Sequence, residues 1–566
     1  MRRAVSLTTL GALAALWPLS CGSLNKGEVV IVDESAGAPS AGGVSGSAGK
    51  GGGPAGGAAG KGGASGKGGG AGDAGEAGVG TGANGGSGSG GKGGSSSGGT
   101  GGSSRGGTGG GAGEPPTDCT ELSDCAGVKP ICDDGTCRAC VPRAMPDECA
   151  ELTTTPLCDD SGRCVQCLHN GDCKGSSQSV CDAGSCRGCL EGSECDSGAC
   201  NGGRCAPESS VIYALAGAGS YDMDCGTLAK PCMRLLDAAG KLSEASPNLV
   251  LIATSAKFTY ENAVLPPGIN VWVFGNDVTI EGFDSPILTK SGGGLYLDDV
   301  VVSANASGGT MVPGFSAVDL TSVALRMRRG AVYNNNKEYG GHGITLTDCG
   351  ADVKQVEFWN AYTGLVFQGT AGLPGQVLTV ERCLFQNNFQ ALDVNANTFT
   401  IRNNLFVANG LASYTRVIRL AGVNTSIFSY NTLYGNDNNC SYDGGLVACS
   451  TVDGCGINSS NLFWGNMFGG TAVGAEPCPD QVYPYPPTIA YTLAEQTWAG
   501  LGNIDGSLPG NDPRLANPGA GDFAPSSGSP AIDAGDTEPA VVPDVDYYGN
   551  PRPVGAAPDI GAIEVE

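Results

Sequence analysis

Beyond Val211, apolar and polar positions follow a repeat. Short runs of β-branched and aromatic residues alternate with glycine and asparagine, and one six-residue phrase recurs. The phrase starts at Asp299, Gly330, Val356, Cys383, Asn404, Asn431 and Asn461. The steps between starts are 31, 26, 27, 21, 27 and 30 residues, the size of one coil of a parallel β-helix. The pattern therefore predicts an all-β solenoid of three-stranded coils over residues 210–566.

Two positions of the phrase have a physical meaning. The third position is apolar in every copy: Val301, Val332, Phe358, Phe385, Phe406, Leu433 and Phe463. Alternation along a strand predicts that this column points into the core. The sixth position reads Ala304, Asn335, Ala361, Asn388, Asn409, Asn436 and Asn466. Asparagine tolerates a left-handed backbone and stacks in hydrogen-bonded ladders, so this column predicts turns rather than catalytic groups.

The start of this domain has the features of a capped solenoid. Cys225 and Cys232 flank a short loop and are expected to pair. An amphipathic helical stretch is expected from Met233 to Ala245. Its apolar face would close the open end of the core and cover its edge strands.

The coils resemble the right-handed, single-stranded parallel β-helix of pectin-lyase-like proteins. The segments Ser529–Asp536, Asp544–Pro553 and Asp559–Glu564 resemble the tail of surface-anchored bacterial β-helix proteins of the choice-of-anchor type. A tail motif is therefore expected from about residue 510. Together the two resemblances cover residues 211–566 and imply an exported β-helix protein. Because most such proteins have no known activity, they imply the fold more than the function.

Two outward columns supply candidate binding residues. The fourth position of the phrase reads Val302, Tyr333, Trp359, Gln386, Val407, Tyr434 and Trp464. It places Tyr333 beside Trp359, and Tyr434 beside Trp464, about 5 Å apart, where exposed rings can stack on sugars. The position before the phrase reads Asp298, Arg329, Gln355, Arg382 and Asn403, polar groups suited to hydroxyls or carboxylates. The alternative is that loops cover the aromatic rings and the polar stripe is only solvated.

A catalytic alternative depends on three residues. Gly341-His342-Gly343 resembles the Gly-His-Gly signature of polygalacturonases, and Asp298 with Asp299 resembles their acid pair. Inverting glycosidases need two carboxyls about 6.5–9.5 Å apart. The Asn-Thr-Asp and Arg-Ile-Lys motifs of that family are absent from this sequence. Polysaccharide hydrolase or lyase activity is therefore the second hypothesis.

A calcium site is a further, weak candidate. Asp544-x-Asp546 followed by Gly549-Asn550 resembles a Ca²⁺ loop with one residue too many. Oxygen ligands suit this ion. A turn without metal is the preferred interpretation, and no other cofactor is expected.

Residues 119–205 contain sixteen cysteines in four units of four. The units begin at Cys119, Cys140, Cys167 and Cys189. Units this short cannot bury a core, so eight disulfides are expected, with a connectivity that the spacing leaves open. The two Cys-x2-Cys pairs at Cys164 and Cys186 also fit a zinc ribbon, but an exported chain favours disulfides. The module resembles the small disulfide repeats of secreted proteins, such as EGF-like or Dickkopf-type modules, which implies a stalk or contact role.

The N-terminal residues indicate export and anchoring. Residues 1–20 have the basic start and short apolar run of a signal peptide, and no later stretch is long enough for a transmembrane helix. Cys21 resembles the lipidated cysteine of bacterial lipoproteins, although Pro18 stands where leucine is usual. Simple secretion is the alternative. After an anchor-proximal segment at 21–35, the Gly/Ala/Ser-rich residues 36–115 predict a disordered tether with an r.m.s. span of roughly 50 Å.

The charge of the chain limits its partners. The formal net charge is −25, and residues 209–566 carry 34 Asp and Glu against 16 Lys and Arg, or −18. This balance disfavours nucleic acids and anionic lipid surfaces, which bind basic patches. The membrane is expected to be reached through the lipid anchor alone, and the oligomeric state is left open.

These observations give one functional hypothesis with one alternative. The chain is expected to be a lipoprotein of the outer membrane or cell surface, or otherwise a secreted protein. Its role is expected to be non-catalytic: adhesion, a structural surface element or binding of extracellular polysaccharide. The alternative is a polysaccharide-degrading enzyme of pectin-lyase fold.

Overall fold

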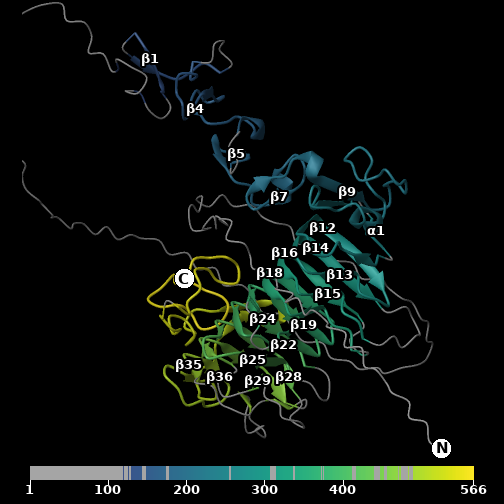
Figure 1. The fold of residues 1–566 in the computed structure, drawn as a ribbon. Coiled ribbons are helices and arrows are strands. Elements are labelled where there is room, and N and C mark those ends of the chain that lie inside the picture. The colour runs from purple at the N-terminus through teal and green to yellow at the C-terminus, as the bar shows by residue number, and fades with distance from the viewer. Residues whose placement is uncertain are drawn as a thin grey trace, which may run out of the picture.

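The structure of the chain is a computed structural model (Figure 1). It describes residues 119–566 apart from 120–124, 126–128, 135, 143–147, 174–177, 254–255, 260, 306–313, 336–337, 339, 371–372, 374, 411–415, 439–445, 451–454, 469–470, 473–481, 484–488 and 539. The predicted signal peptide, Cys21, the anchor-proximal segment and the tether at 36–115 lie outside the described residues. Within the described part of the chain, no helix has both the length and the apolar character needed to cross a membrane.

The cysteine module consists of four small units built alike. Each unit contains an antiparallel hairpin: β1 (Ile131–Asp133) with β2 (Thr136–Arg138), β3 (Leu157–Cys158) with β4 (Cys164–Val165), β5 (Val180–Asp182) with β6 (Ser185–Arg187), and β7 (Cys200–Asn201) with β8 (Arg204–Cys205). The third and fourth cysteines of each unit lie on its hairpin, as Cys132 and Cys137 do in the first. A hairpin this short cannot bury a core of its own, so its stability has to come from cross-links.

Eight disulfides link the module in one order. In every unit the first cysteine bonds the third and the second bonds the fourth: Cys119–Cys132, Cys125–Cys137, Cys140–Cys158, Cys149–Cys164, Cys167–Cys181, Cys173–Cys186, Cys189–Cys200 and Cys195–Cys205. The predicted disulfides are confirmed. The zinc-ribbon spacing is not realised, because the sulfur atoms that lie within 4.8 Å of one another always belong to one unit.

From Val211 the chain winds into a parallel solenoid, which confirms the predicted fold class (Figure 1). Sheet 1 begins with single long strands in the order β9 (Val211–Leu215), β10 (Asn248–Ile252), β12 (Val271–Phe283), β14 (Gly294–Asn305), β16 (Ala324–Asn334) and β18 (Gly350–Trp359). Beyond β18 each coil contributes two shorter strands, which continue sheet 1 as two files. The first file is β20 (Val377–Glu381), β23 (Thr398–Arg402), β26 (Ile427–Ser429), β30 (Ile457–Ser459) and β35 (Ile489–Ala490). The second file is β21 (Leu384–Gln386), β24 (Leu405–Val407), β27 (Thr432–Tyr434), β31 (Leu462–Trp464), β36 (Leu493–Ala494) and β37 (Ile504–Asp505).

Sheet 2 forms the other wall of the solenoid. Its nine parallel strands are β11 (Ala263–Val264), β13 (Leu288–Ser291), β15 (Val318–Thr321), β17 (Ile344–Thr347), β19 (Thr363–Gln368), β22 (Gln390–Asn395), β25 (Ile418–Ala421), β29 (Val447–Cys449) and β34 (Val482–Tyr483). A small third sheet contains β28 (Asp437–Asn438), β32 (Met467–Phe468) and β33 (Thr471–Ala472). The side chains between sheets 1 and 2 form one continuous apolar core.

The predicted core column is confirmed from the second copy of the phrase onward. Phe358, Phe385 and Phe406 are fully buried and stack with ring centroids 4.6 and 5.0 Å apart. The first copy is out of register by one residue, because Val302, not Val301, pairs with Val332. Val302 is therefore in the core, and the expectation that it faces outward is wrong.

Asparagine ladders run along the inside of the turns. Asn388, Asn409, Asn436 and Asn466 are buried, and each amide donates to the next one 3.0 Å away. Asn335 does not belong to this ladder, since Asn334 takes the buried position beside Ala304. The sixth position of the phrase is thus a turn ladder, except in the copy that starts at Gly330, where the buried asparagine is at the fifth position.

A left-handed residue bends sheet 1 at the same point of every coil. The positions concerned are Asp299, Arg329, Gln355, Arg382, Asn403, Tyr430, Ser460 and Tyr491, with φ between 47° and 58°. The polar residues before the phrase therefore occupy the bend between the two halves of sheet 1. The left-handed conformation carries a steric cost for residues with a side chain, which asparagine and aspartate bear best.

The cap differs in length from the prediction. Cys225 and Cys232 form the predicted disulfide, but α1 spans only Leu235–Ala239. Gly240 follows it directly, and glycine ends helices readily. Leu235, Ala238 and Ala239 are buried in the core, so this single turn still closes the end of the solenoid.

The C-terminal tail folds back along sheet 1 and is drawn in yellow in Figure 1. It contains the hairpin of β38 (Leu515–Asn517) and β39 (Asp522–Pro525). Phe523, Ala562 and Ile563 pack against Leu405 and Val407 of β24. The Arg552–Glu564 ion pair, at 2.8 Å, has no solvent exposure. The segment predicted as a tail motif is therefore an integral part of the solenoid domain.

The last module unit also packs on sheet 1. Ala199 and Ala206 of this unit share an apolar cluster with Val250 and Phe274 of β10 and β12. Tyr213 Oη donates to the carbonyl of Ser197 at 3.0 Å. The module is thus fixed to the first coils rather than joined to them by a free linker.

Candidate functional site

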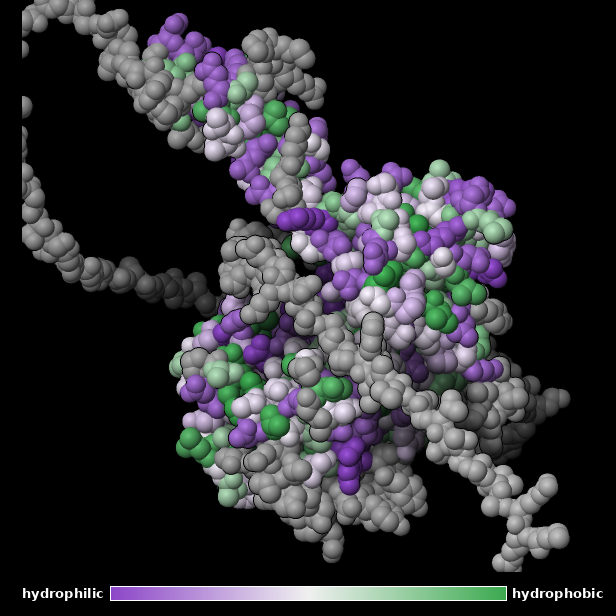
Figure 2. Space-filling model, in the orientation of Figure 1, coloured by the Kyte–Doolittle hydropathy of each residue, from purple (hydrophilic) through white to green (hydrophobic). Residues whose placement is uncertain are grey.

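The outer face of sheet 1 is covered at both ends and open between them. The last module unit covers β10 and β12, and the tail covers the second file from β21 onward. The open stretch consists of β14, β16 and β18, and we call it the window. In Figure 1 the module unit with β7 and the yellow tail lie on the same side of the solenoid, with β16 and β18 between them. On the face shown in Figure 2, hydrophilic and hydrophobic residues are mixed without a large continuous apolar area.

Two aromatic side chains from neighbouring coils face outward in the window. Tyr333 on β16 pairs with Trp359 on β18 in the strand register, so both rings leave the same face. Their centroids are 6.3 Å apart and their planes are tilted by 35°. Both side chains are half-buried, so part of each stays accessible to solvent. The structure therefore brings this predicted pair together.

Carboxylates surround the pair. Glu357 is exposed on the same strand as Trp359 and accepts a hydrogen bond of 3.1 Å from its Nε1. Burial raises the pKa of the Tyr333 phenol, and the charges of Glu357 and Asp277 raise it further. Asp277 is exposed where β12 bulges. The site thus combines two aromatic faces with acidic hydrogen-bond acceptors.

Asp298 and Asp299, considered as the acid pair of a hydrolase, interact with Arg329. Both oxygens of Asp298 accept from Arg329 Nη2, at 2.7 and 2.8 Å. Burial raises the pKa of Asp298 and of Asp299, and Arg329 opposes this shift in both. Arg329 therefore neutralises an acid at the bend of the sheet.

His342 lies on the other wall of the solenoid. It directly precedes β17 of sheet 2, and its ring meets Tyr362 edge to face at 5.9 Å. Burial lowers the pKa of its imidazole, and the carboxylate that opposes this shift is Asp393, which Arg419 holds at 2.9 Å. The structure does not bring His342 to Asp298 or Asp299, so the predicted catalytic grouping is not formed.

The second predicted aromatic pair is beneath the tail. Phe523 packs on Tyr434 with centroids 5.3 Å apart. Trp464 packs against the cluster that includes Leu493 and Ile560. The tail therefore packs against both rings and leaves them only partly exposed, so the expectation of an open stacking surface at this pair is corrected.

The remaining predicted site residues are part of the tail interface. Arg382 Nε donates to the carbonyl of Tyr547 at 3.1 Å. The carboxylate of Asp546 is buried and accepts from the backbone N–H groups of Asn550 and Glu564 at 2.8 and 3.1 Å. Asp544 is exposed. N–H donors take three of the roughly four acceptor sites of the Asp546 carboxylate, which favours the turn without metal.

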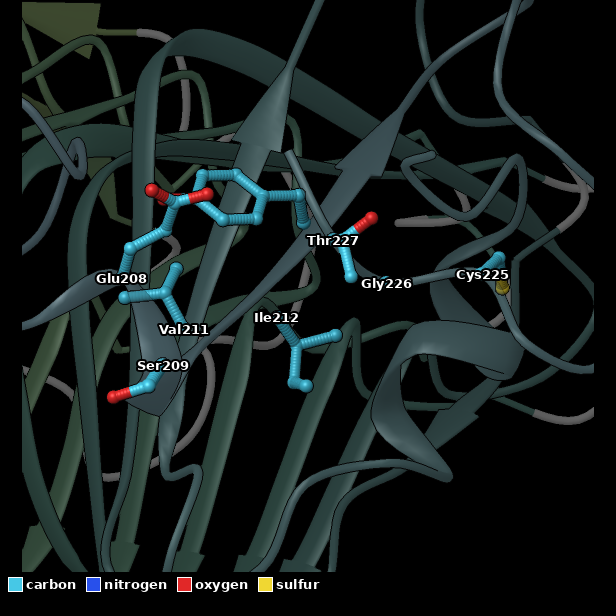
Figure 3. Close-up of a pocket in the computed structure, with 8 residues that line it drawn as sticks. Glu208, Ser209, Val211, Ile212, Cys225, Gly226 and Thr227 are labelled. Carbon is cyan, nitrogen blue, oxygen red and sulfur yellow. The ribbon is translucent and has the colours of Figure 1, made fainter. Parts of the chain in front are cut away.

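Two hollows adjoin Glu208, which lies between the last module unit and the solenoid. The larger has a volume of about 430 Å³ and is lined by Glu208, Ser209, Val211, Ile212, Tyr213, Cys225, Gly226 and Thr227 (Figure 3). The smaller, of about 270 Å³, is lined mainly by residues of the last two module units. No predicted site residue lines either hollow, and Cys225 is already bonded to Cys232. Neither hollow therefore offers a reactive group that the sequence predicted.

Sequence reasoning missed Glu357, Asp277 and the extent of the cover. A signal for the cover exists at the second position of the phrase, which also faces outward. There the window has Ala331 and Glu357, whereas the covered coils have Leu384, Leu405, Thr432 and Leu462. Outward leucines on successive coils predict a covering element, and the fourth position alone could not show this.

The comparisons with known proteins identify little beyond the architecture. Residues 106–211 match the model of a family of unknown function (DUF8331), which is less than a fifth of the chain. No curated protein matches the chain at a significant level. The chain is similar to the solved structure of pectate lyase Pel9A, at 12% identity and a TM-score of 0.29, over 64% of this chain and 100% of that one. It is also similar to XylC in complex with xylose, at 11% identity and a TM-score of 0.21, over 56% and 66% of the two chains. Both likenesses are too weak to carry an argument about function.

Proposed function

We propose that this chain is an exported, surface-attached protein that binds polysaccharide without cleaving it. The observation that carries the proposal is the half-exposed Tyr333–Trp359 pair in the window, flanked by Glu357 and Asp277. Aromatic faces bind the apolar C–H faces of sugars, while carboxylates accept hydrogen bonds from sugar hydroxyls. The pair and its acids therefore supply both kinds of contact that a sugar ring offers.

The rest of the molecule supports display of such a site outside the cell. Eight disulfides within fewer than ninety residues are typical of an oxidising compartment. Acylation of Cys21, followed by the glycine-rich segment, would attach the chain to the surface.

The groups considered for hydrolysis support binding better than catalysis. Asp298 is held by Arg329, and His342 lies on sheet 2. A general acid and base pair has to flank one glycosidic bond. The non-catalytic role is accordingly the conclusion, and cleavage is an outcome of the test.

The test is retention of the full chain on a panel of neutral and acidic polysaccharides, measured by affinity electrophoresis. Tyr333→Ala and Trp359→Ala are each expected to weaken retention about two- to tenfold, because a stacking contact contributes about 0.5–1.5 kcal/mol. Tyr221→Ala is the matched control, since Tyr221 is a 68% exposed tyrosine near the capped end, outside the window.

Two results would contradict the proposal. If the unmodified chain were retained on no polysaccharide, or if both window variants behaved like Tyr221→Ala, the window would not be a binding site. Release of new reducing ends from a retained polysaccharide would instead show that the protein is an enzyme.

A further inference from the structure

We infer that the window takes an uncharged polysaccharide, lying along the solenoid axis, and contacts about three sugar units of it. This inference rests on the proposed function and adds the class, orientation and length of the ligand. Three observations support it: the sign of the exposed charges beside the aromatic pair, the direction of that pair and the position of the two covers.

The exposed charges beside the aromatic pair are acidic. Glu357 and Asp277 are both exposed, and the hydrogen bond that Glu357 accepts comes from the neutral indole of Trp359. Next to them, Glu281 accepts from Lys257 at 2.6 Å and from Asn305 at 2.9 Å. A uronic acid stacked on Trp359 would bring its carboxylate close to Glu357, and like charges at short distance repel.

The cations closest to the bend are engaged by the protein, whereas Arg326 on the first half of β16 lies 3.8 Å from Asp352 with 38% of its side chain exposed. Arg329 forms its ion pair with Asp298, and Arg382 donates to the tail. Lys354 and Arg402 both contact Glu381, at 3.0 and 2.5 Å. Recognition of an acidic sugar requires a cation that can form a charge-assisted hydrogen bond to it. These cations would have to leave their partners first, so the window favours uncharged sugars.

The aromatic pair sets the direction of the ligand. Tyr333 and Trp359 stand on neighbouring coils, so the line between their rings runs along the solenoid axis and across the strands. A sugar chain that contacts both rings has to follow this line. The tilt of 35° between the rings suits a chain whose successive sugars are rotated relative to each other.

The last module unit and the tail limit the length of sugar chain that the window can hold. At one end, Gly192 of the last module unit lies against Phe274 of β12, and at the other end the carbonyl of Tyr547 in the tail accepts a hydrogen bond of 3.1 Å from Arg382, which precedes β21. Between them lie three strands, which at the spacing of a β-sheet occupy about 14 Å. This length fits a trisaccharide.

The experiment is calorimetric titration of the full chain with linear oligosaccharides of one to six units. The neutral probes are xylo-, cello-, manno- and galacto-oligosaccharides, and the acidic probe is oligogalacturonate. The expected result is that at least one neutral series binds, that its affinity rises up to the trimer and then levels off, and that oligogalacturonate binds at least tenfold more weakly.

A variant with Glu357→Gln and Asp277→Asn tests the role of the charges. Its expected effect is a rise of at least threefold in oligogalacturonate affinity relative to the neutral trimer. Glu244→Gln, an exposed acid outside the window, is the control and is expected to leave this ratio unchanged.

The outcomes separate this inference from the proposed function. Equal or tighter binding of oligogalacturonate, or an unchanged ratio in the double variant, would overturn the ligand class while leaving a glycan-binding protein. A neutral series whose affinity still rose from trimer to hexamer would overturn the length. Binding of none of the five series would contradict the proposed function itself.

Discussion

The cysteine module and the solenoid are stable for different physical reasons. Each module unit has a hairpin of two or three residues per strand and two disulfides, and its buried residues are mostly the cysteines themselves. The solenoid instead has one continuous core and buried hydrogen-bond ladders that pass from coil to coil. The module depends on covalent bonds that limit its unfolded states, whereas the solenoid depends on contacts that only the folded state makes. The two regions should therefore respond to different perturbations: reduction of disulfides should unfold the module, and loss of core contacts should destabilise the solenoid.

The largest expected effect is that of reduction on the module. Each disulfide closes a loop of 10 to 18 residues and contributes about 3 kcal/mol, so reduction of all eight should unfold the module completely. The solenoid should stay folded, because its core contains few disulfides. Hydrogen exchange with and without reductant measures both regions in one sample. Retained protection of residues 129–205 after complete reduction would show that the module has a core of its own.

The next largest effect is expected from Phe385→Ala in the solenoid. The ring is fully buried between Phe358 and Phe406, so its loss leaves a cavity and should lower the free energy of unfolding of the solenoid by about 3–5 kcal/mol. Thermal unfolding monitored by circular dichroism provides the value. Phe385→Leu serves as control with a smaller loss, and an equal destabilisation of the module would break the separation between the two regions.

A smaller effect is expected from Asn409→Ala in the inner ladder. The substitution leaves the amide of Asn388 and the carbonyl of Phe385 without their partner, which should cost about 2–3 kcal/mol. Asn335→Ala is the matched control, because Asn335 is exposed and bonds Asn305 on the outside of the coils. If both variants unfolded at the same denaturant concentration, the inner ladder would not contribute more than the outer one.

The smallest effect is expected from pH, through Asp559 of the tail. Burial raises the pKa of this carboxyl to about 6, above its unfolded value of 3.8. The folded state therefore binds the proton more tightly, so stability is highest below pH 4 and falls by about 2 kcal/mol or less as the pH rises towards 6. Asp559→Asn should remove this slope in unfolding experiments between pH 4 and 6.5. A solenoid whose stability rose with pH over this range would contradict the assignment.

Several features could be predicted because they repeat. The six-residue phrase indicated the coils, and the third position located Phe358, Phe385 and Phe406 in the core. The count of four cysteines per unit indicated two disulfides per unit, although the order of pairing needed the structure. The first copy was misplaced by one residue because β14 pairs with β16 in a register that puts Val302, not Val301, beside Val332, and the weak copy at Asp299 does not show this register.

The column predicted both aromatic pairs, but only one of them lies in the window. Tyr333 and Trp359 follow from the column, but Tyr434 and Trp464 occupy the same column and pack against the tail. The column shows which side chains point outward, and it contains no information about a segment a hundred residues away.

The local features of this protein follow from its sequence alone: the coil length, the inward column, the turn ladders and the division of cysteines into units. These features depend on contacts between residues that are close in the chain or one coil apart, so they are visible in the repeat. Which part of sheet 1 is open follows only from the tertiary structure. That depends on where the last module unit and the C-terminal tail pack, and such long-range contacts are made by apolar surfaces that fit in space without any spacing in sequence. The window with Tyr333 and Trp359 exists because two non-repetitive segments cover the coils on either side of it and leave the coils between them uncovered.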